Sequence, residues 1–99
     1  MKAIRWNTAK NALLQAERGI SFEVIEWAIA HGGLVARIPH PNQVKYQRQE
    51  VFVVLVESYV YLVPFIEEED YIFLKTIIPS RKATKKYLTE KSDEKDEKV

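Results

Sequence analysis

Apolar and polar positions near the start of the chain predict a short strand followed by a helix. Residues 3–6 lean apolar and are typical of an edge strand. Asn7 or Thr8 can begin a helix, because both side chains accept hydrogen bonds from free backbone N–H groups. Apolar residues then recur at helical spacing as far as Gly19, a residue type that often ends helices. We therefore expect a helix over residues 8–18.

A second helical pattern follows almost at once. Ser21 can cap it, and Glu23 places a negative charge in the first turn, where the helix dipole favours one. Apolar residues form a stripe that continues until Gly32 and Gly33 end the pattern. Because so few residues separate the two segments, we expect a helical hairpin or an L-shaped pair.

The pattern changes to one typical of strands after the glycines. Residues 34–38 predict a strand, and the two prolines in residues 39–42 predict a loop because proline blocks strand pairing. Residues 43–50 are mostly polar and lead into residues 51–56, a continuous apolar run. Such a run indicates a central strand that is buried on both faces.

Two further strands complete the predicted sheet. They cover residues 59–66 and 71–78, and polar turns at residues 57–58 and 67–70 precede them. Short turns between successive strands predict an antiparallel meander. Pro64 falls inside the first of these strands, where we expect a bulge or a missing hydrogen bond.

The end of the chain is charged. Pro79 and Ser80 end the last predicted strand, and residues 81–90 predict a helix. Residues 92–99 carry four acids and two lysines, and we expect this tail to be disordered. The predicted fold is thus α+β, with two N-terminal helices packed on an antiparallel meander and a C-terminal helix, in one domain over residues 1–91.

Composition adds three limits to this picture. A chain of 99 residues fits one domain. It has no cysteine, which excludes disulfides and thiolate metal sites. No apolar run reaches the roughly 18–20 residues needed to span a bilayer, and the N-terminus has no signal-peptide pattern, so we expect a cytoplasmic protein.

The residues that usually bind metals or nucleotides are sparse. His31 and His40 lie nine positions apart, whereas zinc sites gather three or four ligands. The acidic turn at residues 67–70 can attract a cation, but adjacent turn residues point in different directions, and a solvated turn is the more common outcome. Three glycines do not make a phosphate-binding loop. We therefore expect no metal and no cofactor.

Basic residues are concentrated in the predicted C-terminal helix, although the net charge of the chain is only +1. The helical spacing i, i+1, i+4 and i+5 places four of them on one face, which suits a phosphate backbone or is simply a solvated surface. A turn centred on residues 68–69 also places Lys75 opposite Leu62, among apolar side chains. The four residues are Arg81, Lys82, Lys85 and Lys86.

Three segments, in order, resemble the BrnT family of toxins. Residues 6–10 (Trp-Asn-Thr-Ala-Lys) are similar to its Trp-Asp-x-x-Lys opening, and residues 18–23 (Arg-Gly-Ile-Ser-Phe-Glu) to its Lys-His-Gly-Val-Ser-Phe-Glu segment. Residues 78–86 are similar to its Ile-Ser-Ala-Arg-Lys-Ala-Thr-Arg motif, and Arg48 stands where the family often has an arginine. The resemblance covers about residues 4–90.

The resemblance implies a RelE/ParE-like fold and the role of a type II toxin. Such toxins are ribonucleases that cleave mRNA, and a small antitoxin with a ribbon-helix-helix domain neutralises them. Attack by the 2′-hydroxyl on the adjacent phosphate needs no metal, because positive side chains can stabilise the charge that develops. Two other functions stay open, a non-catalytic RNA-binding protein and a protein-interaction module.

The family's pattern also implies which residues act. Arg81 and Arg48 stabilise the charge on the reacting phosphate. Glu23 or Tyr61 is the candidate for proton transfer. The implied RNA-binding cations are Lys10, Lys75, Lys82, Lys85 and Lys86.

Overall fold

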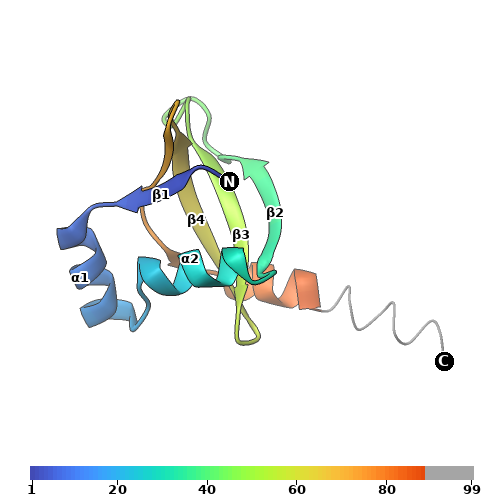
Figure 1. Cartoon of the computed structure of the whole chain (residues 1–99). Helices are drawn as coiled ribbons and strands as arrows, with labels where there is room; N and C mark the ends of the chain where they lie inside the picture. Colours follow the sequence, from blue (N-terminus) through green and yellow to red (C-terminus); the bar gives the residue numbers. More distant parts are fainter. Residues whose placement is uncertain (89–99) are drawn as a thin grey trace.

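Residues 1–88 form an α+β fold in the computed structural model, with helices near both ends and a sheet between them (Figure 1). The predicted α+β class is confirmed. Residues 89–99, which include the predicted tail and the last two residues of the predicted C-terminal helix, lie outside the described residues. Within residues 1–88, no helix is long and apolar enough to cross a membrane.

Both predicted N-terminal helices are present, and each begins at its predicted capping residue. α1 (Thr8–Arg18) follows Asn7, whose side chain accepts a backbone hydrogen bond of 2.9 Å, and it ends at Gly19 with a φ of 65°. α2 (Phe22–Ala30) follows Ser21, whose Oγ accepts a backbone hydrogen bond of 3.2 Å. Local capping chemistry therefore sets the ends of these two helices.

The sheet is mixed, with the strand order β1-β5-β4-β3-β2 and with β6 paired to β4. The predicted antiparallel pairing of the three central strands is confirmed, and β1 extends the sheet by lying parallel to β5. β2 is one residue longer than predicted, because Pro39 pairs with Glu50 instead of belonging to the loop. The strands are β1 (Ala3–Trp6), β2 (Leu34–Pro39), β3 (Glu50–Val56), β4 (Tyr59–Glu67), β5 (Tyr71–Leu74) and β6 (Ile78–Pro79).

The prediction of one strand over residues 71–78 is wrong. The segment divides into β5, which pairs with the end of β4, and β6, which pairs with its beginning. Pro64 lies between these two stretches of β4 and has no N–H to donate, although its carbonyl accepts the Lys75 N–H at 2.8 Å. Pairing between β3 and β4 has no shift at this point. On the other edge of β4 the register shifts by one residue, so that residues 63–64 lie opposite residues 75–77, and the irregularity expected at Pro64 occurs on that edge.

The predicted register between β4 and the following segment is also wrong. Phe65 pairs with Leu74, which centres the turn one position later than predicted. Continued along β4, this register would place Ile77 opposite Leu62, but one additional residue between β5 and β6 places Ile78 there. Lys75 is therefore not opposite Leu62. Lys75 is exposed just beyond the end of β5, so it does not lie among apolar groups as predicted.

The main core lies between the two N-terminal helices and one face of the sheet. Phe22 and Ile25 of α2 are completely buried in it. On the sheet, the rings of Phe52 and Phe65 stack with their centroids 3.8 Å apart. Trp6 of β1 stacks on Phe22 at 5.6 Å, which joins the edge strand to the same core.

The opposite face of the sheet is also covered. Val51 and Val53 of β3 point to this face and are buried, which confirms the prediction that this strand is buried on both faces. Residues 81–88 are helical, and Thr84 Oγ1 accepts a 2.7 Å hydrogen bond from the backbone N–H of Val60 in β4. This contact fixes the C-terminal helix beside the first residues of β4.

Candidate functional site

The C-terminal helix has a packed side and a charged side, as the spacing of its residues predicts. Ala83, Thr84, Tyr87 and Leu88 are half-buried. The charged side, here called the basic face, is exposed, and none of its members forms an ion pair with another residue among 1–88. These side chains are therefore available to bind phosphate groups. The basic face consists of Arg81, Lys82, Lys85 and Lys86.

The structure brings Tyr61 close to the beginning of the basic face. Tyr61 of β4 pairs with Pro79 of β6, and the Ser80 N–H donates to the carbonyl of Val60 at 3.0 Å. Arg81 is the next residue along the chain. Of the residues implied by the resemblance, Tyr61 and Arg81 are thus placed on neighbouring segments.

A hollow lies on the other side of Tyr61. Its volume is about 530 Å³, and Tyr59 and Tyr61 form part of its wall, with ring centroids 5.5 Å apart. Ile20 and Val24 contribute apolar wall from the side of the N-terminal helices. Tyrosine rings at the edge of an open hollow are surfaces on which an unpaired base can stack.

Arg48 lies at the other end of the sheet from Arg81. Its Nη2 donates a 2.9 Å hydrogen bond to Glu68 in the turn that follows β4. The C-terminal helix contacts Val60, eight residues earlier, which corresponds to about 26 Å along an extended strand. Arg48 and Arg81 therefore cannot hold the same phosphate in this arrangement.

Glu23 fastens the two N-terminal helices together. Its carboxylate accepts a 2.7 Å hydrogen bond from Asn11 Nδ2, and Asn11 Oδ1 accepts the Phe22 N–H at 2.8 Å. The hydrogen bond from Asn11 is the main reason that the pKa of Glu23 lies below its ordinary value. A lowered pKa makes a carboxylate a weaker base, which does not favour a role in proton transfer.

Sequence reasoning did not single out Asn11, although it is one of two buried polar residues of the described chain. Its signal was weak, because an asparagine inside an amphipathic helix usually belongs to the solvated side. Its role becomes visible only when α2 is placed beside α1.

The two remaining lysines are separate from the basic face. Lys10 is half-buried in the first turn of α1, and its backbone N–H bonds the Asn7 side chain. Lys75 holds its Nζ 5.5 Å from the ring centroid of Phe73. Neither ammonium group makes a hydrogen bond or an ion pair with another described residue.

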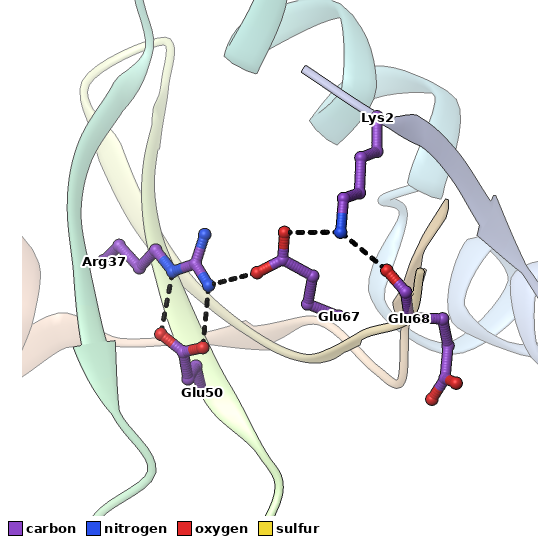
Figure 2. A network of polar contacts seen from close by, with 5 residues as sticks. All are labelled: Lys2, Arg37, Glu50, Glu67 and Glu68. Carbon is purple, nitrogen blue, oxygen red and sulfur yellow. Dashed lines mark hydrogen bonds and ion pairs between the residues drawn. The ribbon is translucent and has the colours of Figure 1, made fainter. Parts of the chain in front are cut away.

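An ion network that sequence reasoning missed joins several strands at the far end of the sheet (Figure 2). Arg37 of β2 donates two hydrogen bonds to Glu50 of β3 and one to Glu67 of β4, each of 2.7 Å. Lys2 pairs with Glu67 at 3.0 Å and donates to the Glu68 carbonyl at 2.7 Å. The partners lie far apart in the sequence, so no local pattern indicates the network.

Acid is expected to weaken this network. Hydrogen bonds from Arg37 lower the pKa of both Glu50 and Glu67 below the ordinary value of 4.5. A carboxylate with a lowered pKa stabilises the fold above its ordinary pKa, and that contribution disappears as the pH falls through the lowered value. Arg37→Gln should therefore reduce the loss of stability between about pH 6 and about pH 3, measured as the urea midpoint.

Arg5→Gln is the matched control for this prediction, because Arg5 lies over the Tyr71 ring at 5.1 Å and has no carboxylate partner among residues 1–88. This variant should keep the acid sensitivity of the parent chain. Equal pH profiles for Arg37→Gln and the parent would show that the network does not contribute to it.

Within residues 1–88, no three histidine or acidic side chains are grouped so that they could hold a metal ion. The candidate site consists of the basic face, with Tyr61 on the neighbouring strand. Comparison with known proteins finds no matching protein family, no matching curated protein and no matching solved structure.

Proposed function

We propose that this chain is the toxin of a type II toxin–antitoxin pair and acts in the cytoplasm as a metal-independent endoribonuclease on mRNA. The observation that carries the proposal is the exposed basic face, which begins beside Tyr61. The three ordered segments that resemble the BrnT family support it. The partner is then a small antitoxin with a ribbon-helix-helix domain.

The proposed reaction needs charge and a proton carrier. The 2′-oxygen of RNA bonds to the adjacent phosphorus, and the bond from phosphorus to the 5′-oxygen breaks, so negative charge increases on the phosphate oxygens. Arg81 stabilises this charge, while the lysines of the basic face hold neighbouring phosphates. Tyr61 relays the proton that the 2′-hydroxyl loses to the leaving 5′-oxygen, or its ring stacks on a base. Glu23 and Arg48 take no part in this step, because Glu23 is bonded to Asn11 and Arg48 lies too far away.

Arg81→Ala tests the proposal. Because a positive group that stabilises the developing charge is lost, RNA cleavage should fall by about a hundredfold or more, and expression should no longer arrest growth. Arg5→Ala is the matched control, since Arg5 also lies on the surface but belongs to β1, at the edge of the sheet. It should retain cleavage within a few-fold. A parent chain that leaves RNA intact and whose expression is harmless would contradict the proposal.

A non-catalytic RNA-binding role is the second candidate. Of the two candidates for proton transfer, Glu23 is bonded to Asn11 instead. Only Tyr61 then lies beside the basic face, and the lack of a second proton-transfer group favours binding over cleavage. Binding of single-stranded RNA that weakens steeply with salt, in a chain that does not cut, would select this role.

A further inference from the structure

A groove runs between α2 and the turn that joins β3 and β4. The hollow beside Tyr61, of about 530 Å³, adjoins a second hollow of about 220 Å³. The two share Val24, Val56 and Glu57 as wall residues, so they form one continuous depression. We call this depression the α2 groove.

The wall of the second hollow is mainly apolar, and two of its apolar side chains are exposed. Trp27, which lines the second hollow, has 62% of its surface exposed, and Val24 has 39%. The Trp27 ring stacks on His31 with the centroids 4.1 Å apart, which holds the indole in a fixed orientation. A large, oriented and exposed aromatic side chain next to a hollow is typical of a binding anchor.

The charge of the α2 groove differs from that of the basic face. The residues that line the two hollows include no lysine or arginine, and Glu57, their one charged member, lines both. Glu26 of α2 lines a different hollow, beside β1, and Glu23 is bonded to Asn11 of α1, so neither carboxylate belongs to the groove. A carboxylate at the wall of such a surface, with no lysine or arginine beside it, attracts lysine and arginine of a partner.

We propose that the α2 groove binds an amphipathic helical segment of another protein, with apolar side chains in the hollows and lysine or arginine at its edges. Burial of Trp27 and Val24 supplies the apolar contact, and Glu57 supplies the complementary charge. A second copy of this chain does not offer such a segment within residues 1–88. Its basic helix already packs against its own sheet through Thr84. The inference does not depend on RNA cleavage.

Calorimetric titration of the full chain tests the inference with two synthetic helical peptides of about five turns. They share leucine and phenylalanine on one side, and their polar positions are either all lysine or all glutamate. The lysine peptide should bind, more weakly at high salt, and the glutamate peptide should not. Trp27→Ala should weaken binding about tenfold or more. Leu13→Ala, which removes a 47% exposed side chain of α1 outside the groove, should not.

Tryptophan fluorescence distinguishes a helical peptide from RNA or a second copy as the partner of the α2 groove. Trp6 is the other tryptophan and stacks on Phe22 in the core, so Trp27→Phe should remove the spectral change that the peptide causes. Three outcomes would overturn the inference. One is that both peptides bind equally well, or that neither peptide binds. Another is single-stranded RNA that changes Trp27 emission, which would assign the groove to nucleic acid. The third is self-association that Trp27→Ala abolishes, which would assign it to a second copy.

Discussion

Replacing Phe65 with alanine is expected to lower the free energy of unfolding by about 3–5 kcal/mol. The Phe65 ring is completely buried in the middle of the sheet and stacks on Phe52 at 3.8 Å. The Phe65 ring also contacts Arg37, whose guanidinium lies 5.0 Å from the ring centroid. Removal of the ring loses the transfer free energy and leaves a cavity between β3 and β4. Urea unfolding at neutral pH measures the difference.

Phe73→Ala is the matched control, because it makes the same chemical change one strand away. Phe73 of β5 is only half-buried and lies outside the main core. We expect this variant to lose about 1 kcal/mol, as is common for partly exposed positions. Equal losses in the two variants would mean that the face packed by the helices is not the main core.

Local features made the N-terminal half predictable. Asn7, Ser21 and Gly19 act within one helical turn, and all three behave in the structure as their chemistry predicts. The basic face was predictable for the same reason, since helical spacing alone places its residues together.

Contacts between distant segments were not predictable. The register of β4 against β5 depends on where the acidic turn is centred, and all four residues of that turn are polar, so the pattern gives no preference. The division into β5 and β6 depends on Pro64. This residue precedes Leu74 of β5 and Ile78 of β6 by ten residues or more, so no local pattern indicates the division. The parallel pairing of β1 joins segments that are 68 positions apart in the register, such as Ala3 and Tyr71.

The candidate site likewise combines features that local patterns predict with contacts between distant segments that they do not. Arg81 and Tyr61 lie on neighbouring segments because β6 pairs with β4, and the predicted register placed a different residue opposite Tyr61. Arg48 was included because of its position in a motif, and motif order carries no information about the length of β4 that separates it from Arg81. The resemblance thus supplied residue types, and the sheet decides which of them can act together.

Gly33→Ala is expected to lower the free energy of unfolding by about 3 kcal/mol, since overpacking and a lost hydrogen bond add together. A Cβ at Gly33 would lie 2.7 Å from the Leu55 carbonyl oxygen and 2.8 Å from that of Ala28. Both are backbone atoms, so a side chain cannot turn aside to make room. Movement of the backbone would stretch the bonds that Gly33 makes, 2.7 Å to the Ala28 carbonyl and 2.8 Å from the Leu55 N–H.

Gly32→Ala separates this close approach from backbone strain. Gly32 has a φ of +91°, but a Cβ there meets no atom within 4 Å, so we expect a loss of only about 1–2 kcal/mol. Urea unfolding of both variants gives the comparison, and a larger loss for Gly32→Ala would contradict the close packing of α2 on β3. Gly33 and Leu55 also line the α2 groove. Gly33→Ala should therefore widen the groove and weaken binding of the lysine peptide even where the chain is still folded, whereas Gly32→Ala should leave that affinity unchanged.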